Sequence, residues 1–314
     1  MPLASRCERV SLRGAALTVS AALALSLCAS PASAATVGGV IGWGKPDFGV
    51  TVPPAEALTG VTAVSAGTTT VLALKGGTVL AWGANNWGAN EVPAAALSGV
   101  GQIASGWGHE LALKNGAVLA WGNDWYGQTD LPASVTSGVT AIATSYMHSL
   151  ALKQNGQVVS WGTRTDVPAA AQSGVTAIAA GGDHNLAIKN GGVLAWGSNV
   201  YGQAAVPSAL SSGVTAVSAG FQHSIALKDG RVYAWGRNNY GQATVPDAAL
   251  SDVVGIDAGA NHNLAFKANG DIIAWGSNVV GETFPDPLPC GPVFAVSAGD
   301  SDSFGLKEDP TAPC

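Results

Sequence analysis

One pattern of apolar and polar positions recurs along the chain, and its clearest copy spans residues 212–246. Three runs rich in apolar and β-branched residues, at 214–220, 223–228 and 231–235, alternate with short Gly-containing or polar segments. Runs of this length bounded by Gly predict β-strands. A fourth, shorter strand is expected over 242–246, where Pro246 is restricted to an edge or to the strand's end.

A Trp-Gly pair closes the third run of each copy. It occurs seven times, with its tryptophan at Trp43, Trp82, Trp121, Trp161, Trp196, Trp235 and Trp275. Successive pairs are 39, 39, 40, 35, 39 and 40 residues apart, the short interval arising from a loop shortened by four residues at 162–168. A fixed period of this size indicates a repeat architecture.

The connections and faces of the runs predict how the repeats are arranged. Asp229-Gly230 joins the second and third runs, and Asn-Gly pairs stand there at 115–116, 155–156, 190–191 and 269–270. Such pairs supply the positive φ angles of a tight hairpin. Both faces of the runs are small or apolar, which is typical of sheets covered on both sides. Four-stranded antiparallel units packed face to face around an axis form a β-propeller.

The two ends of the chain hold incomplete repeats that complement each other. Residues 37–44 form a third run with no earlier runs before it, and residues 293–299 and 303–307 form two runs with no third after them. Joined in one blade, they would close the ring and hide its exposed strand edges. We predict an all-β fold for residues 35–314, a seven-bladed β-propeller whose N- and C-terminal strands share a blade.

Residues 1–34 have the features of a secretory signal. Arg6, Arg9 and Arg13 precede an apolar stretch at 15–28, and the small residues at 32–34 form a cleavage site. The alternative, a lipoprotein signal modified at Cys28, fits poorly with the bulky Leu27. No later apolar run is long enough to span a bilayer. We expect cleavage near Ala34 and a secreted, soluble, monomeric mature protein.

Composition and charge narrow the possible partners. Gly accounts for 42 of 314 residues and charged residues for 11%. Without the signal, basic residues fall from 14 to 11 and acidic ones from 20 to 19, giving a net charge of about −8. This charge repels nucleic acid and suits a basic partner, although it also keeps a protein soluble. The remaining cysteines, Cys290 and Cys314, are expected to form a disulfide worth about 3 kcal/mol.

Strand polarity places two loops of every blade on one face of the ring. These are the loop between the first and second runs and the loop after the Trp-Gly pair. Nine of the 21 aromatic residues fall in them: Phe48, Trp87, Trp107, Trp125, Tyr126, Tyr146, Tyr201, Phe221 and Tyr240. Because Trp and Tyr are enriched in binding hot spots, this face is the predicted partner-binding surface.

The nine aromatics need not all be exposed. Phe48, Trp87, Tyr126, Tyr201 and Tyr240 stand directly before a loop Gly, where they could instead pack between blades, because large aromatics are highly buried on average. Exposure is expected for the other binding candidates, namely Trp107, Trp125, Tyr146 and Phe221.

The five histidines share one repeat position, five residues before the Lys that ends the second run: His109, His148, His184, His223 and His262. Sevenfold spacing would hold them apart around the ring, too far to share a metal ion. We expect each to be structural and to hydrogen-bond within its own blade, and we expect no metal and no cofactor. Recognised nucleophile, phosphate-binding and zinc motifs do not occur, and no catalytic constellation is readable, so we expect a protein that is not an enzyme.

The pattern Trp-Gly-x-Asn-x-x-Gly-Gln at 196–203 and 235–242 resembles the repeats of the regulator of chromosome condensation family. The copies here lack the Leu-Gly that usually follows in the nuclear proteins. Units such as 173–207 are more similar to those of the bacterial β-lactamase inhibitory proteins of type II, which are secreted seven-bladed propellers. The resemblance covers the chain from Ala35 to about Lys307.

That resemblance implies a protein that blocks class A β-lactamases through aromatics on one propeller face. In that family some of these aromatics directly precede the repeat His, whereas here the residues at 69, 108, 147, 183, 222, 261 and 301 are not aromatic and Trp107, Tyr146 and Phe221 stand one position earlier. Trp87 does match. An inhibitor of a β-lactamase or a related cell-wall enzyme is therefore the first hypothesis. A carbohydrate- or envelope-binding module is the second, and a propeller lyase or hydrolase the third.

Overall fold

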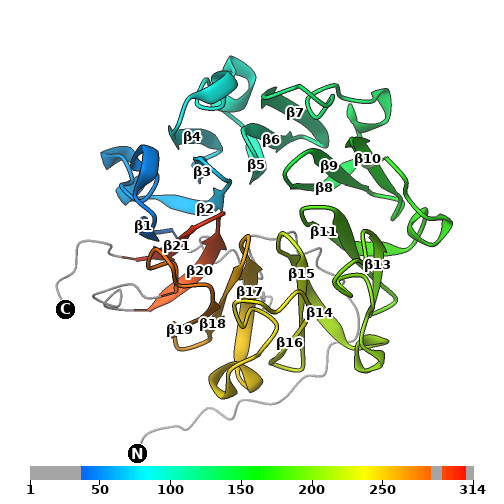
Figure 1. Cartoon of the computed structure of the whole chain (residues 1–314). Helices are drawn as coiled ribbons and strands as arrows, with labels where there is room; N and C mark the ends of the chain where they lie inside the picture. The colour runs from blue at the N-terminus through cyan, green and yellow to red at the C-terminus, as the bar shows by residue number, and fades with distance from the viewer. Residues whose placement is uncertain (1–36, 164, 284–291, 309–314) are drawn as a thin grey trace, which may run out of the picture.

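The computed structural model describes residues 37–163, 165–283 and 292–308. Its strands form seven three-stranded antiparallel sheets arranged as blades around a central axis (Figure 1). The prediction of an all-β, seven-bladed propeller is therefore confirmed. The signal segment and both mature cysteines, Cys290 and Cys314, lie outside the described residues.

Each blade runs from an inner strand at the axis to an outer strand at the rim, in the order inner, middle, outer. The strands of blades 1 to 7 are β2 Val61–Ala66, β3 Thr70–Lys75 and β4 Thr78–Gly83; β5 Val100–Ser105, β6 His109–Lys114 and β7 Ala117–Gly122; β8 Val139–Thr144, β9 His148–Lys153 and β10 Val158–Gly162; β11 Val175–Ala180, β12 His184–Lys189 and β13 Gly192–Gly197; β14 Val214–Ala219, β15 His223–Lys228 and β16 Arg231–Gly236; β17 Val253–Ala258, β18 His262–Lys267 and β19 Ile272–Gly276; and β20 Val293–Ala298, β21 Asp302–Lys307 and β1 Gly39–Gly44.

Blade 7 contains strands from both ends of the chain. β1 pairs with β21 in antiparallel register, with Gly39 opposite Lys307 and Gly44 opposite Asp302, and β21 pairs in turn with β20. In Figure 1 the blue first strand accordingly lies beside the red last ones. The predicted closure is confirmed.

The predicted fourth strand is wrong. Residues 242–246 form turns and extended chain that lead into a 3-10 helix. Pro246 is extended, with φ −71° and ψ 153°, and the helix after it buries Ala249. Because proline lacks an N–H and has a fixed φ, this segment leads into a short 3-10 helix rather than forming a ladder strand. The 3-10 helices are η1 Asp47–Gly49, η2 Ala55–Leu58, η3 Asn86–Gly88, η4 Ala94–Leu97, η5 Ala133–Val135, η6 Ala169–Ala171, η7 Ser208–Leu210 and η8 Asp247–Leu250.

The middle and outer strands are joined by the predicted hairpin turns. Asn115 and Gly116 both have positive φ, as do Asp229 and Gly230, which is the conformation of a type I′ turn. In the longer turns only the glycine, Gly156 or Gly270, has positive φ, and the side chains of Asn155 and Asn269 accept hydrogen bonds from the backbone two residues on.

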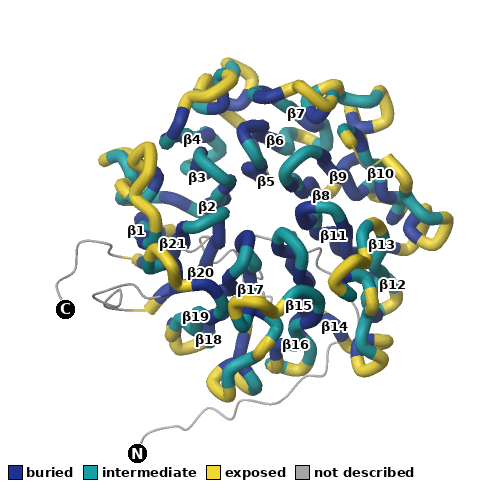
Figure 2. The backbone as a smooth tube through the Cα atoms, in the orientation of Figure 1, coloured by how far each residue is buried: buried dark blue, intermediate teal, exposed yellow. Residues whose placement is uncertain are grey.

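Apolar side chains from neighbouring blades form the core between them. One such cluster joins Leu72 and Leu74 of blade 1 to Ile103 and Trp121 of blade 2. Figure 2 shows buried chain along the middle strands and exposed chain in the rim loops. Because both faces of a blade pack against neighbours, the small and apolar character of both faces is explained.

The Trp-Gly tryptophan joins its blade to the preceding one. Six of the seven indole N–H groups donate to a backbone carbonyl in the loop that follows the preceding blade, as Trp235 Nε1 does to the Gln203 oxygen at 2.9 Å and Trp121 Nε1 to the Ala89 oxygen at 2.8 Å. Trp196 Nε1 finds no partner within the described ranges. The loop before it is the one shortened by four residues, so the carbonyl is missing.

The expectation that each histidine would bond within its own blade holds for His148, whose Nδ1 lies 2.8 Å from Ser145 Oγ, but the histidines also bridge blades. His184 Nε2 lies 2.9 Å from Ser224 Oγ of the next blade, and His223 Nε2 lies 2.8 Å from Asn263 Oδ1. Ser224 Oγ itself donates to the Gln203 carbonyl that also receives the Trp235 indole N–H. His184 of one blade and Ser224 and Trp235 of the next therefore form one polar seam between the two blades. The same contact is made by His109, His148 and His262.

Candidate functional site

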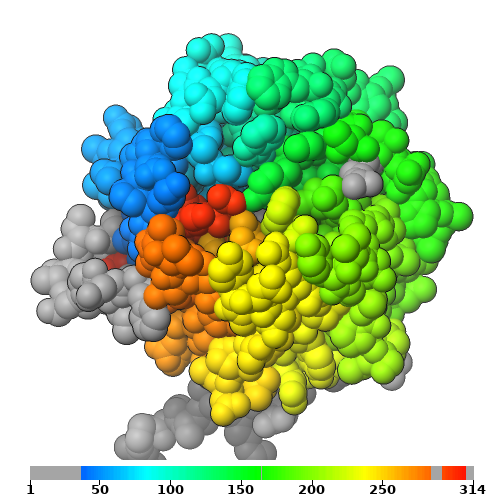
Figure 3. Space-filling view, viewed as in Figure 1, coloured from blue at the N-terminus to red at the C-terminus, as the bar shows by residue number. Residues whose placement is uncertain are grey.

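Two sets of loops lie at one end of the ring, and we call this end the loop face. The inner loops, at 67–69, 106–108, 145–147, 181–183, 220–222, 259–261 and 299–301, connect inner to middle strands. The outer loops, at 45–54, 84–93, 123–132, 163–168, 198–207, 237–246 and 277–283, follow the outer strands. All nine candidate aromatics lie in these loops. Atoms of the seven blades meet closely around the centre of the ring (Figure 3).

The inner strands and inner loops surround a channel of about 750 Å³, counted with its open solvent. Its wall is closed by side chains that bridge neighbouring inner strands. Asp257, only 8% exposed, accepts hydrogen bonds from Ser218 Oγ at 2.9 Å and from the Ala298 N–H at 2.9 Å. Burial raises the pKa of this carboxyl to about 6 against those hydrogen bonds. Its role is to join blades 5, 6 and 7.

Tyr146 reaches across the channel mouth. Its hydroxyl, on blade 3, donates to Asp300 Oδ1 of blade 7 at 2.5 Å, and its ring packs on Phe221 of blade 5 at 4.7 Å. Burial, together with the Asp300 carboxylate, raises the pKa of the phenol. Tyr146 and Phe221 therefore occupy the mouth of the channel and hold three blades together there.

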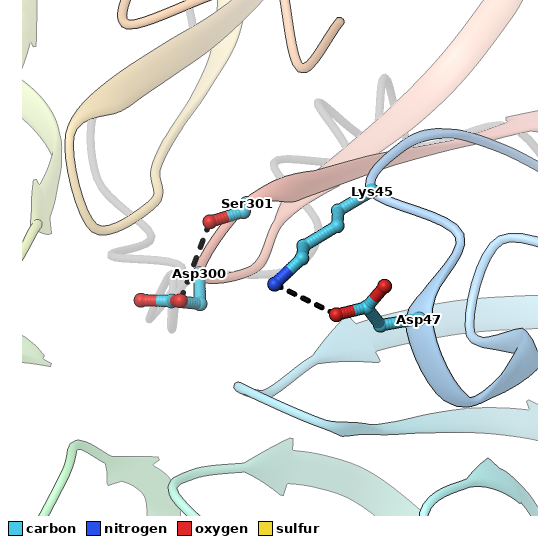
Figure 4. Close-up of polar contacts among 4 residues, drawn as sticks. All are labelled: Lys45, Asp47, Asp300 and Ser301. Carbon is cyan, nitrogen blue, oxygen red and sulfur yellow. Dashed lines mark hydrogen bonds and ion pairs between the residues drawn. The ribbon is translucent and has the colours of Figure 1, made fainter. Parts of the chain in front are cut away.

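Asp300 is also close to the rim of blade 7. Figure 4 shows the Lys45 ammonium between Asp300 and Asp47, paired with Asp47 Oδ2 at 2.7 Å. The Asp47 carboxylate raises the pKa of Lys45, and the Asp300 carboxylate adds to this effect. The positive charge of Lys45 is therefore already matched by this chain's own acids.

Three tryptophans from blades 1 and 2 meet on the loop face, and we call them the tryptophan cluster. Ring centroids of Trp87 and Trp125 are 5.3 Å apart, those of Trp87 and Trp107 5.6 Å, and those of Trp107 and Trp125 6.5 Å. The rings meet edge to face or tilted, which is the favourable geometry for aromatic pairs. Trp87 remains 39% exposed and Trp125 66%.

Local sequence explains how Trp87 is held. In other outer loops a Gln side chain accepts the N–H of the aromatic, as Gln203 Oε1 does from Tyr201 N at 2.8 Å. The loop of Trp87 has Ala89 at that position, and Trp87 adopts the left-handed conformation with φ 58°. Its ring lies on Gly108, where an added Cβ would be 2.6 Å from Trp87 Cε3. Only glycine leaves room for this packing.

Exposure of the nine aromatics differs from the expectation at three positions. Phe48, Trp87, Tyr126, Tyr201 and Tyr240, which could have packed between blades, are 39–62% exposed. Of the four expected to be open, Trp125 is exposed, whereas Trp107, Tyr146 and Phe221 are only partly so. The last three lie in inner loops, which converge on the axis, and the sequence carries no signal of that convergence.

The loop face is acidic. Among its described residues are seven side chains outside the core that carry a carboxyl group, and two basic ones, Lys45 and Arg237. The acids are Asp47, Glu91, Asp124, Asp130, Asp166, Asp183 and Asp300. The lysines that end the middle strands lie at the opposite end, where Lys114 and Lys228, for example, donate to the carbonyls of Ala95 and Ala209 in the 3-10 helices. The net negative charge is thus concentrated on the aromatic face.

The buried histidines belong to the seams between blades. Burial lowers the pKa of His109 and His184 to about 3 and that of His223 and His262 to about 4. Across the described ranges, no three His, Cys, Asp or Glu residues are arranged so as to hold a metal ion. None of the helices in those ranges is long and apolar enough to cross a membrane.

Glu110 is a buried carboxyl at the position where other blades have Ser or Asn. It is fully buried, and neither of its oxygens makes a hydrogen bond of good geometry within the described part of the chain, although the Ser105 side chain on the neighbouring strand lies close enough to oppose its pKa shift. The preceding blade has Thr70 in place of the histidine that would otherwise bond there. Burial raises the pKa of Glu110 well above its usual value.

Replacing Glu110 by an apolar side chain of similar length should therefore stabilise the protein. We expect Glu110→Met to raise the free energy of unfolding at pH 7.5 by about 1–3 kcal/mol, the usual penalty of an unpaired buried polar group. The pKa of Glu110 is higher in the folded than in the unfolded protein, so Glu110 destabilises the wild type increasingly as pH rises above the usual pKa of a glutamate. The stability gained by Glu110→Met should therefore be smaller at pH 4.5 than at pH 7.5. Urea unfolding at both pH values measures it. The exposed Glu91→Met is the control, and an equal gain there would contradict this account.

Comparison with known proteins identifies the repeat. The sequence model of the regulator of chromosome condensation (RCC1) repeat matches residues 175–203, 214–242 and 253–282, which are blades 4, 5 and 6 with their outer loops. No curated protein matches the chain in sequence. Blades 4, 5 and 6 therefore carry RCC1-type repeats, in a chain that has the fold of the RCC1-type propellers throughout.

Several solved structures share this fold. Prp20p from Saccharomyces cerevisiae, studied for its binding to Gsp1p and histones, superposes with a TM-score of 0.69 at 19% identity, over 88% of this chain and 92% of that one. Human WBSCR16 gives 0.64 at 18% identity, over 86% and 98%. The ectodomain of the Physcomitrella patens receptor kinase CR4 gives 0.64 at 22% identity, over 80% and 71%. At these identities the likeness shows the fold alone.

Proposed function

We propose that this RCC1-type propeller is an exported protein-binding module that inhibits class A β-lactamases or a related cell-wall enzyme by docking its loop face on them. The observation that carries the proposal is the tryptophan cluster, a rigid and partly exposed group of three large aromatics on one face. Such residues dominate the binding energy of protein interfaces, because they give large contacts at little entropic cost.

Three further features support the proposal. Prp20p, with the same fold, binds protein partners. The sequence of each repeat resembles the secreted β-lactamase inhibitory propellers, and residues 1–34 have the composition of an export signal. The buried histidines and Asp257 hydrogen-bond to neighbouring blades, which leaves the exposed aromatics of the loop face as its contact surface.

The test is inhibition by the purified chain 35–314, titrated into a panel of class A β-lactamases while hydrolysis of a chromogenic cephalosporin is followed. We expect one-to-one inhibition by the wild type and at least about 30-fold weaker inhibition by Trp125→Ala, the loss typical of a hot-spot residue. Trp125 is 66% exposed, so its replacement should leave the fold intact. Tyr146 is a poor choice for this test, because its loss would also open the channel mouth.

Arg231→Ala, on the exposed end of β16 at the opposite end of the ring, is the matched control and should inhibit like the wild type. Absence of inhibition across the panel would refute the β-lactamase proposal. Retention of the protein on purified peptidoglycan, lost in Trp125→Ala, would then indicate that the cluster stacks on envelope sugars instead.

A further inference from the structure

We propose that the tryptophan cluster recognises a lysine or arginine side chain presented by the partner protein. This inference rests on the proposed function, because it specifies the chemistry of the group that docks on the loop face. Two observations support it: Arg237 lies over the ring of Tyr201, and the equivalent aromatic, Trp87, lacks such a contact within the described residues.

The chain itself places a cation over an aromatic of this face. The Arg237 guanidinium lies 5.3 Å from the centroid of Tyr201, and its Nη1 donates to Gln222 Oε1 at 2.7 Å. Tyr201 stands directly before the Gly of the outer loop of blade 4, and Arg237 directly follows the Trp-Gly pair of blade 5. The loop face therefore has the geometry to hold a guanidinium over that aromatic position.

Trp87 occupies the position of Tyr201 three blades earlier, but no cation of the described residues lies over its ring. The residue corresponding to Arg237 is Asn123, which is 1% exposed and accepts the N–H of Trp125 at 2.9 Å. The cation–aromatic contacts formed in the described chain involve Arg231 and Arg237, both in blade 5. Among the described residues the three indole rings of the cluster thus have no cation over them, although Trp attracts cations more strongly than Tyr.

The cluster is also organised before any partner arrives. Gly108 allows Trp87 to lie against the inner loop, and Trp107 and Trp125 fix it from two sides at 5.6 and 5.3 Å. Trp87 keeps its left-handed backbone in this arrangement. Little conformational entropy remains to be lost on binding, so even a weak contact with one side chain contributes to affinity.

Charge selects the sign of the side chain. Asp124 directly precedes Trp125, Asp130 lies in the same loop, and Glu91 lies in the loop of Trp87, where its Oε1 accepts from Asn85 Nδ2. All three carboxylates are exposed. They attract a lysine or arginine on a partner and repel an acidic one, so the cluster is suited to a basic segment rather than to a purely apolar one.

The test follows the indole Nε1–H signals of the 15N-labelled chain 35–314 during titration with two short peptides. One is acetyl-Gly-Lys-Gly-Arg-Gly-amide, and in the other Gln replaces both basic residues. We expect signals assigned to Trp87, Trp107 and Trp125 to shift with the basic peptide, in a salt-dependent manner, and binding of the Gln peptide to be about 5- to 30-fold weaker. Trp125→Leu should abolish most of the response and Trp125→Phe should retain part of it, while Tyr240→Leu, on the same face, serves as the control.

Equal binding of both peptides, or no shift at about 10 mM of the basic one, would overturn the inference. Neither result depends on β-lactamase inhibition. If the chain inhibits the enzyme but binds both peptides equally, the proposed function stands and recognition of a basic side chain by the cluster is refuted. If it binds the basic peptide but inhibits no enzyme of the panel, recognition stands and the β-lactamase proposal is refuted.

Discussion

Gly122→Ala is expected to lower the free energy of unfolding by about 3–5 kcal/mol, the range of the most disruptive single substitutions. Gly122 is the glycine of a Trp-Gly pair and has φ +95°, and an added Cβ would lie 2.4 Å from the Gly108 carbonyl oxygen and 3.1 Å from His109 Cα. Both obstacles are backbone, so neither can move aside cheaply. The shift of the urea midpoint of chain 35–314 measures the loss.

Gly202→Ala separates the two causes. Gly202 also has positive φ, +82°, but an added Cβ would meet nothing within 4 Å. Its replacement should show only the strain of a left-handed alanine, about 1–2 kcal/mol. Equal losses at the two sites would mean that backbone overlap is not why Gly follows each of the seven tryptophans.

His223→Gln is expected to destabilise the protein at pH 7.5 and to do so less at pH 5. Desolvation lowers the pKa of His223 to about 4 in the folded protein, against the hydrogen bond to Asn263 that opposes the shift, whereas the unfolded value is about 6.5. A folded-state pKa below the unfolded one contributes stability that is full above pH 6.5 and is lost as pH falls toward 4. At pH 5 the loss amounts to about 2 kcal/mol for this one histidine.

The comparison of wild type and variant isolates this effect from the rest of the molecule. Burial raises the pKa of Glu110 and Asp302, and that of Asp257 to about 6. These carboxyls therefore increase the free energy of unfolding as pH falls, which offsets the opposite effect of the histidines when the wild type is measured alone. Trp235→Phe, which removes the indole bond to Gln203 in a neighbouring seam, is the control and should have the same effect at both pH values. A His223→Gln difference that stays constant from pH 7.5 to 5 would refute a neutral buried imidazole.

Most of the architecture could be predicted because its signals are local. Strand composition, Asn-Gly turns and the spacing of Trp-Gly pairs each describe a single repeat, and the complementary ends describe closure. The prediction of a fourth strand was wrong because an extended segment need not pair with a sheet. Residues 245–246 are extended, as their sequence suggests, but they lead into η8 instead of pairing with an outer strand. The contacts from histidines to the next blade were missed because the sequence gives no sign that residues such as Ser224 and Asn263 face the preceding blade.

The candidate site could be predicted as a face but not as a geometry. Strand polarity places nine aromatics at one end of the ring. It does not show that Trp87 crosses to the next blade to meet Trp107 and Trp125, because this requires Ala89 in place of the usual Gln and the space left by Gly108. Nor does it show that Tyr146 spans the channel to Asp300, a contact between residues 154 positions apart.

Closure of blade 7 by both ends of the chain affects how the molecule can assemble. Open repeat arrays need terminal repeats with polar outer faces, whereas here each blade has two neighbours and none must serve as a cap. Because the closed ring needs no polar capping repeat, a chain with only 11% charged residues can form it without exposing an apolar blade face. β1 pairs with β21, about 260 residues later in the chain, so β1 has no partner strand until β21 has been made. Closing the ring is therefore a long-range step that carries a large loop-closure entropy.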